Sequence, residues 1–178
     1  FDREARCHIP DYEEVVDASI NAILTLTHAY DGSSSSSSSS SRGGMVAGKG
    51  TAGNSLLAES RVLDVGCATG YTMMALVRKG FSPKHVYGVD ASAAMLDVTR
   101  ANLRHHGYGD EAASNLYLSD TLPRELIGSC NDGPKGGVLG AVLANWTLHF
   151  IVSADERRAY LRSVFEALKP GGVFILTD

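Results

Sequence analysis

The chain has 178 residues, a formal net charge of −4, 44% hydrophobic residues and 20% charged residues. This composition is typical of one globular domain with a substantial core, and it excludes a disordered chain. No apolar run approaches the roughly 20 residues that a membrane-spanning helix needs. Without a run of Lys or Arg, the sequence gives no direct nucleic-acid signal.

Three scattered cysteines, Cys7, Cys67 and Cys130, bear on the compartment. Their odd number and wide spacing predict no disulfide framework and a cytoplasmic location. The first ten residues lack the charged and then apolar pattern of a secretory leader. No metal site is expected, because Cys7 and His8 have no partners at metal-ligand spacing in the sequence.

An amphipathic helix is predicted over Asp11–Thr27, because apolar side chains recur there at helical spacing. Nine consecutive serines, Ser33–Ser41, follow it. Such a tract buries too little apolar surface to offset its ordering entropy, so residues 31–51 are predicted to be a flexible Ser/Gly-rich insertion. Residues 1–30 then form an N-terminal lid region, and residues 52–178 form the ligand-binding domain.

Strands and helices alternate through the rest of the chain. The predicted strands are Arg61–Val65, His85–Val89, Asn115–Leu118, Val138–Ala144 and Val173–Thr177. The predicted helices are Asn54–Glu59, Tyr71–Lys79, Ala93–His105 and Ser153–Leu168, the last with Tyr160, Leu161, Val164, Phe165 and Leu168 on one face. Ser92 and Ser153 are predicted N-caps. The alternation predicts a doubly wound, mostly parallel α/β sheet of strand order 3-2-1-4-5.

The first predicted strand ends in a turn of small residues, RVLDVGCATG over Arg61–Gly70. Asp64 is expected to face the crevice at the strand's end, because an unpaired buried charge is costly. A second carboxylate, Asp90, follows the next strand. A small-residue turn with an acid after the next strand is how a doubly wound sheet holds an adenosine-type ligand. Ala68 and Tyr71 replace two glycines of the dinucleotide pattern, so a smaller nucleoside is favoured over a dinucleotide.

Five features stand in one order along the chain: the turn at Asp64–Gly70, Asp90, Ser119–Asp120, Asn145 and the LKPGG segment before the last strand. In this order they resemble the Rossmann-like (class I) S-adenosylmethionine-dependent methyltransferases. The resemblance implies an enzyme that uses S-adenosyl-L-methionine and transfers its methyl group to an acceptor. We expect that acceptor to be a small molecule, and a homodimer is left open.

The resemblance also implies which residues hold the cofactor. The turn residues would carry the methionine end, Asp90 the ribose hydroxyls, and Asp120 with Thr121 the adenine edge. Asn145 is the candidate catalytic residue. The expected cofactor-binding residues are Tyr12, Asp64, Gly66, Cys67, Ala68, Gly70, Asp90, Ala91, Ser92, Met95, Asp120, Thr121 and Asn145. Trp146 and His149 are expected to pack or to line the pocket.

Further segments resemble the carboxy-S-adenosylmethionine synthase family, which serves the modification of wobble uridine in bacterial tRNA. They are Phe1–Asp2, Ile9–Tyr12, the Gly66–Gly70 turn and Asn145–Phe150. Three functions therefore stay open: methyl transfer, carboxylation of the cofactor itself, and a catalytically inactive cofactor-binding subunit. The acceptor is not identified. Because an apolar strand at Val173–Leu176 would form a sheet edge, we expect the chain to be a fragment that lacks C-terminal strands.

Overall fold

The computed structural model of the chain describes residues 7–33, 59–127 and 137–178. The predicted insertion at 31–51 therefore lies outside the described residues except for residues 31–33. The predicted helix at Asn54–Glu59 lies outside them except for Glu59.

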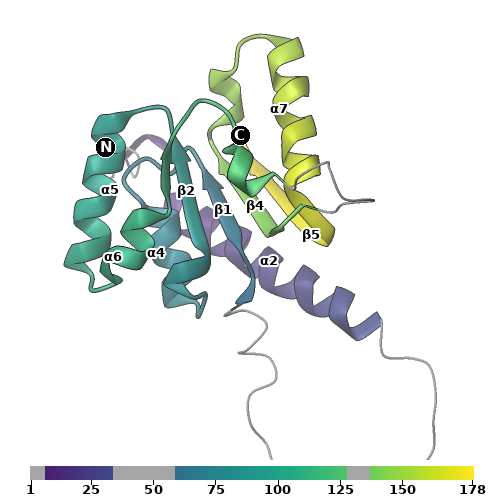
Figure 1. The fold of residues 1–178 in the computed structure, drawn as a ribbon, viewed down its shortest axis with the longest axis horizontal. Helices are drawn as coiled ribbons and strands as arrows, with labels where there is room; N and C mark the ends of the chain where they lie inside the picture. Colours follow the sequence, from purple (N-terminus) through teal and green to yellow (C-terminus); the bar gives the residue numbers. More distant parts are fainter. Residues whose placement is uncertain (1–6, 34–58, 128–136) are drawn as a thin grey trace, which may run out of the picture.

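Helices and strands alternate in the order expected for a doubly wound fold (Figure 1). The helices are α2 (Tyr12–Ser33), α4 (Tyr71–Arg78), α5 (Ala93–His105), α6 (Gly109–Ser114) and α7 (Ala154–Ala167). The strands are β1 (Val62–Val65), β2 (Val86–Asp90), β3 (Leu116–Leu118), β4 (Leu139–Asn145) and β5 (Leu168–Thr177). No helix in the described part of the chain is long and apolar enough to cross a membrane.

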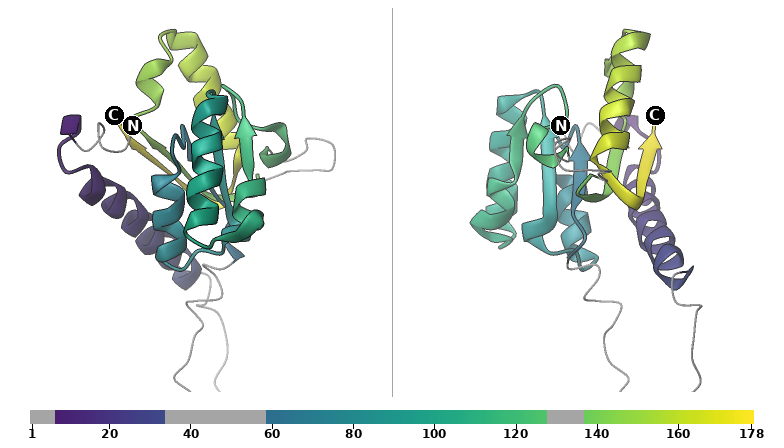
Figure 2. Two further views of the ribbon diagram at one scale, coloured as in Figure 1. Left: turned by 90° about the vertical axis from the view of Figure 1, so that its left-hand side faces the viewer. Right: turned by 45° about the vertical axis from the view of Figure 1, so that its right-hand side comes forward.

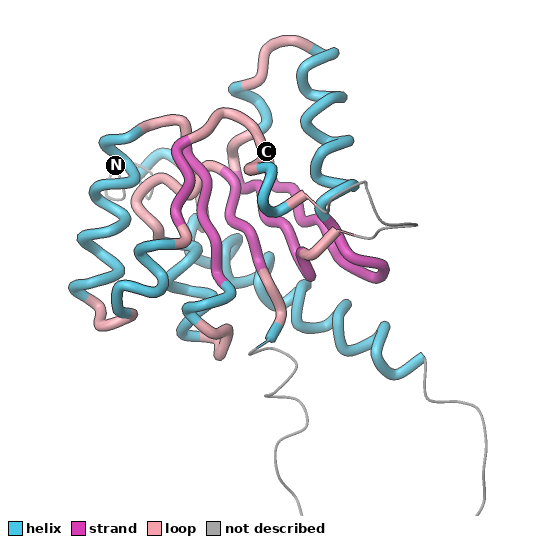
Figure 3. Tube along the Cα trace, viewed as in Figure 1, coloured by secondary structure: helices cyan, strands magenta, loops and turns pink. Residues whose placement is uncertain are grey.

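All four strand pairs are parallel, and the sheet order is β3-β2-β1-β4-β5, which confirms the predicted topology (Figure 3). The strand β4 is buried on both faces from Leu139 to Ala144, as its continuous apolar sequence predicts. Ser92 and Ser153 cap α5 and α7, and their hydroxyls accept from the backbone N–H groups of Met95 and Glu156. Both predicted caps are confirmed.

Two apolar layers sandwich the sheet. On one face, α2, α4 and α5 pack through Ile20, Met73 and Leu96. On the other face, α7 packs through Tyr160 and Val164. Figure 2 shows α2 and α7 on opposite sides of β5. Because α2 covers β4 and β5, the N-terminal helix is part of the core and lies over the edge strand.

Apart from shifts of one residue at the ends of several elements, the structure differs from the prediction in four places. α2 continues to Ser33, so its last three residues are helical where the insertion was expected. α6 was not predicted. β5 begins at Leu168, and the five-residue step from Leu168 to Val173 matches a two-residue step in β4, so the intervening segment bulges out of the ladder. On α7, Phe165 is 79% exposed and Leu161 39% exposed, so only part of the predicted apolar face is buried.

Candidate functional site

The register of the sheet brings three predicted site residues to one level. Val65 of β1 pairs with Val89 of β2 and with Ala144 of β4. The next residue in each strand or turn is Gly66, Asp90 and Asn145, respectively, at the carboxyl end of the sheet. This edge, where the strand order reverses, is where open α/β sheets bind ligands.

In the turn after β1, the backbone lies close to the end of β2 and to the turn after β4. Gly66 has φ 68°, and its N–H donates to the carbonyl of Val89 at 2.8 Å. A Cβ at Gly66 would lie 2.5 Å from Oγ1 of Thr147. Thr147 Oγ1 lies 3.0 Å from the carbonyl oxygen of Val65, to which it donates. The turn after β4 is therefore packed directly onto the turn after β1, and only glycine fits between them.

Asp90 ties this turn to the start of α5. One carboxylate oxygen accepts the N–H of Ala68 at 2.9 Å, and the other accepts the N–H of Ser92 at 2.8 Å. Each oxygen of an ionised carboxylate has a second lone pair, so both can still accept from a ligand. Asp90 thus holds the turn after β1 and the start of α5 in place, and each of its two oxygen atoms can still accept a hydrogen bond from a ligand.

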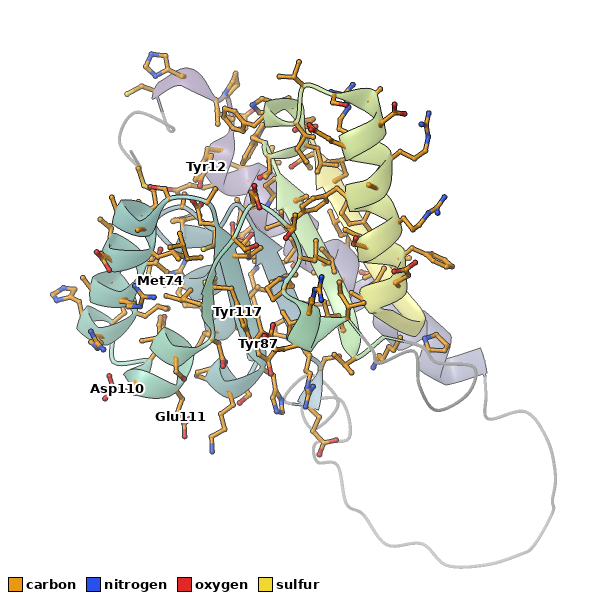
Figure 4. All side chains as sticks on the ribbon, turned by 45° about the horizontal axis from the view of Figure 1, so that its top comes forward. Tyr12, Met74, Tyr87, Asp110, Glu111 and Tyr117 are labelled. Atoms are coloured by element: carbon orange, nitrogen blue, oxygen red, sulfur yellow. The ribbon has the colours of Figure 1, made fainter. Side chains whose placement is uncertain are left out.

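These residues surround a cavity of about 470 Å³, within the range of small-molecule sites. Figure 4 turns this edge of the sheet toward the viewer and shows Tyr12, at the start of α2, beside the strand ends. The residues that line the cavity are Ile9, Tyr12, Asp64, Val65, Gly66, Cys67, Ala68, Thr72, Val89, Asp90, Ala91, Met95, Ser119, Asp120, Asn145, Trp146, Thr147, Phe150, Ile151 and Tyr160.

Ten of the thirteen expected cofactor residues line the cavity, and Gly70, Ser92 and Thr121 do not. Gly70 is the N-cap of α4, with φ 82°, so its role there is to let the chain enter the helix. The hydroxyl of Ser92 caps α5. Thr121 is exposed, and its hydroxyl lies 3.1 Å from that of Ser119. These three residues therefore do not line the cavity.

The sequence reasoning missed the aromatic and apolar part of the lining, chiefly Phe150, Ile151 and Tyr160. The run of apolar and aromatic residues after β4 was a usable signal for the first two. Tyr160 offered none, because it lies on a helix whose pattern only predicts a core residue. Trp146 lines the cavity, whereas His149 does not.

Tyr12 and Trp146 form an aromatic wall between the start of α2 and the turn after β4. Their rings stack at a centroid distance of 5.0 Å and an interplanar angle of 22°. Tyr71, the first residue of α4, lies 5.4 Å from the Tyr12 ring. Trp146 has φ 50°, an uncommon conformation for a bulky residue. Its N–H donates to the carbonyl of Thr177 at 2.6 Å, which anchors the turn to β5.

The amide of Asn145 is oriented by the hydroxyl group of Thr177, whose Oγ1 donates to Asn145 Oδ1 at 2.7 Å. Ser19 Oγ on α2 lies 3.4 Å from the same oxygen and donates to the carbonyl of Val15 at 2.9 Å. The amide nitrogen Nδ2 is buried and has no hydrogen-bond partner among the described residues. Since a buried unpaired donor costs free energy, this geometry favours a ligand atom that accepts a hydrogen bond from Asn145.

Asp64 Oδ2 is the other orphaned side-chain atom among the buried polar atoms of the described residues. Asp64 is 2% exposed. Burial, together with the neighbouring Asp90 carboxylate, raises the pKa of its carboxyl group to about 8. A cationic ligand group would supply the missing partner of this carboxyl group. Burial likewise raises the pKa of the Cys67 thiol, which suits a small spacer and not a nucleophile.

Replacing Asp64 with asparagine is expected to change how stability depends on pH. At pH values below 3.8 the carboxyl group is protonated in both states and contributes nothing. As pH rises from there to about 8, the unfolded chain releases this proton while the folded chain holds it, so the free energy of unfolding falls. Asparagine does not titrate, so the free energy of unfolding of Asp64→Asn does not fall in this way. Relative to wild type, the free energy of unfolding of the variant is expected to rise by at least about 1 kcal/mol between pH 5 and pH 8.

Urea denaturation of the ligand-free protein at both pH values measures this difference. Asp97→Asn is the control, because Asp97 is an exposed carboxylate on α5 that pairs with Arg100. An advantage of Asp64→Asn that stays constant with pH would contradict the raised pKa.

A parallel sheet with a Gly-containing turn after β1, an acid at the end of β2 and a cavity at its carboxyl edge is typical of the Rossmann-like methyltransferase fold. The model of the methyltransferase domain family matches residues 62–172, which is more than half of the chain. The chain belongs to this family. The predicted recognition and fold class are confirmed.

Two curated relatives carry the name carboxy-S-adenosyl-L-methionine synthase. The one from Aeromonas hydrophila subsp. hydrophila is 31% identical over 121 residues, which cover 67% of this chain and 43% of the relative. The one from Pseudoalteromonas translucida is 29% identical over 128 residues, 71% of this chain and 48% of the relative. The chain thus spans less than half the length of these relatives.

A solved structure from work on the conversion of a disulfide bond into a thioacetal group during echinomycin biosynthesis has a similar fold. Its TM-score is 0.51 at 26% identity, and the match covers 67% of this chain and 45% of that chain. Together, the family and the names of the curated relatives imply S-adenosyl-L-methionine as the cofactor.

Proposed function

We propose that this chain binds S-adenosyl-L-methionine in the cavity at the carboxyl edge of the sheet and transfers its methyl group to a small-molecule acceptor. The observation that supports this most is the lining itself. It combines the backbone of the turn after β1, the carboxylate of Asp90 and the Ser119–Asp120 pair, all at one edge of the sheet.

The residues present fit the cofactor. S-adenosylmethionine carries a sulfonium and an ammonium group, and the orphaned buried Oδ2 of Asp64 suits a cationic partner. Asp90 would accept from the ribose hydroxyls with its remaining lone pairs. Asp120, one of the two residues expected at the adenine edge, lines the cavity with Ser119 beside it and would accept from the adenine amine, whereas Thr121 does not line the cavity.

When bound, the cofactor supplies an electrophilic methyl group on a sulfur atom that is a good leaving group. The chain therefore needs mainly to align the acceptor and to exclude water. Asn145 is the candidate residue beside the transferred methyl group. Its amide, held by Thr177, would donate through Nδ2 to the acceptor's nucleophilic atom and so orient a lone pair toward the methyl carbon.

Turnover with methyl-deuterated S-adenosylmethionine tests this proposal. The purified chain is incubated with the cofactor and a set of small phenols, amines and thiols, and products are analysed by mass spectrometry. The expected result is S-adenosylhomocysteine together with an acceptor that carries the deuterated methyl group. Binding of the cofactor without any transfer by a well-folded chain would favour an inactive cofactor-binding subunit instead.

Carboxylation of the cofactor is the second candidate, because both curated relatives described above are named carboxy-S-adenosyl-L-methionine synthase. That reaction needs a second acid substrate and a cation to hold its carboxylate. It would yield a cofactor about 44 Da heavier, the mass increment of an added carboxyl group replacing a proton. The same mass spectra therefore distinguish the two candidates.

A further inference from the structure

The proposed cofactor contacts leave part of the cavity lining unassigned. Phe150 and Ile151 follow β4, and Ile9 precedes α2. Phe150 lines the cavity although 76% of its surface is exposed, so its ring lies at the cavity mouth. His149 packs beside this ring at a centroid distance of 4.2 Å. An aromatic side chain at the mouth offers a planar apolar surface to an incoming molecule.

All the acidic or basic side chains that line the cavity among the described residues are aspartates. Asp90 and Asp120 line the cavity, Asp64 lines it with a carboxyl group whose pKa burial raises to about 8, and no Lys, Arg or His among the described residues lines it. Burial raises the pKa of the Tyr160 hydroxyl, and the charge of the nearby Asp120 raises it further. Tyr160 therefore lies on the Asp120 side of the cavity.

Two basic side chains close to Phe150 and Ile151 in the sequence have other partners. Arg157 on α7 donates to the backbone carbonyls of Ile151 and Val152. The imidazole of His149 lies 3.0 Å from the carboxylate of Asp178. An acceptor with a carboxylate or phosphate would thus meet like charges, and no cation among the described residues of the lining would offset them.

We infer that the part of the cavity lined by Ile9, Phe150 and Ile151 is an acceptor subsite for an aromatic molecule that is neutral or cationic and carries no anionic group. This inference rests on the proposed function, because it takes the rest of the cavity as the cofactor site. It names the acceptor class that the proposed function leaves open.

The chain's single tryptophan makes the test direct, because Trp146 lines the cavity and reports on its occupancy. Its fluorescence is first titrated with S-adenosylhomocysteine. The saturated protein is then titrated with three probes of the same ring and different tails: 4-ethylphenol, tyramine and 3-(4-hydroxyphenyl)propionate. We expect the neutral and cationic probes to bind at least tenfold more tightly than the carboxylate.

A matched pair of variants tests whether the probes bind at the mouth of the cavity. Phe150→Ala is expected to weaken the two preferred probes at least fivefold and to leave S-adenosylhomocysteine affinity unchanged within twofold. Phe165→Ala is the control, because Phe165 is as exposed at 79% but does not line the cavity. It should change neither affinity.

The outcomes separate the two claims. If S-adenosylhomocysteine binds but the carboxylate probe binds equally well or better, or no probe binds, the acceptor class is wrong and the cofactor site stands. An equal effect of Phe150→Ala and Phe165→Ala would likewise overturn the subsite. If S-adenosylhomocysteine itself does not bind, the proposed function fails, and this inference fails with it.

Discussion

Replacing Asp90 with alanine is expected to weaken S-adenosylmethionine binding by about 100-fold or more. In the proposed complex the two carboxylate oxygens accept from the two ribose hydroxyls, and hydrogen bonds to a charged group contribute about 1.5–3 kcal/mol each. Two such bonds at the low end amount to about 3 kcal/mol, and each 1.4 kcal/mol is about tenfold in affinity. Isothermal titration calorimetry measures the loss.

The same substitution also frees the N–H groups of Ala68 and Ser92, from which Asp90 accepts. Thermal melting of the ligand-free variant therefore accompanies the titration, and Asp90→Asn, which keeps the side-chain shape, serves if alanine unfolds the chain. Asp97→Ala removes an equal charge from the surface of α5 and should bind normally. A folded Asp90 variant that binds within threefold of wild type would contradict the ribose role.

Gly66→Ala is expected to be the most destabilising small substitution at the site. The added Cβ would meet Thr147 Oγ1 at 2.5 Å in a backbone conformation of φ +68°. The left-handed conformation alone costs a non-glycine residue about 1–2 kcal/mol. Overpacking at a well-packed contact adds about 1–3 kcal/mol. We expect a total loss of about 2–5 kcal/mol in the free energy of unfolding, measured by urea denaturation.

Gly107→Ala separates the two causes. Gly107 has φ +76°, and apart from its chain neighbours no atom lies within 4 Å of the position that a Cβ would take there, so the loss of stability in Gly107→Ala should reflect the backbone conformation alone. Adding Thr147→Ala to Gly66→Ala removes the clashing hydroxyl and should restore part of the stability. If Gly66→Ala and Gly107→Ala cost the same, the close contact between the two turns is not important.

Strand order and helix starts could be predicted because each depends on short-range patterns. The apolar run of β4 and the caps Ser92 and Ser153 are local signals, and the right-handed crossover rule converts the alternation into a sheet order. The acid Asp90 and the Gly66 turn could be placed for the same reason, since parallel strands end at one edge.

What the sequence did not reveal depends on tertiary contacts. The helix α6 has six residues, too few for a periodic pattern, and packs through Ala112. The polar side chains of Asp110 and Glu111 pair with Arg104 and Lys84, and both acids lie on α6 in Figure 4. β5 starts at Leu168, whose carbonyl accepts a hydrogen bond from the N–H of Gly137. This contact is long-range in sequence, and Pro170 with the two glycines after it does not predict a strand.

The candidate site likewise contains residues that could be predicted from the sequence and residues that could not. Residues in the turns at Gly66 and Asp90 were predicted from motifs, whereas Phe150, Ile151 and Tyr160 reach the cavity only through the packing of α7 and the turn after β4. Phe165 was predicted to share the apolar face of its helix and is exposed, because α7 covers the sheet with a narrower stripe that includes Tyr160 and Val164.

The measurement that tests the central claim most directly is a calorimetric titration of the purified chain with S-adenosylmethionine and, separately, with NAD⁺. We predict one S-adenosylmethionine site per chain, weakened strongly by Asp90→Ala and not by Asp97→Ala, and no binding of NAD⁺. Binding of NAD⁺ in preference to S-adenosylmethionine, or S-adenosylmethionine binding that is indifferent to Asp90, would contradict the account.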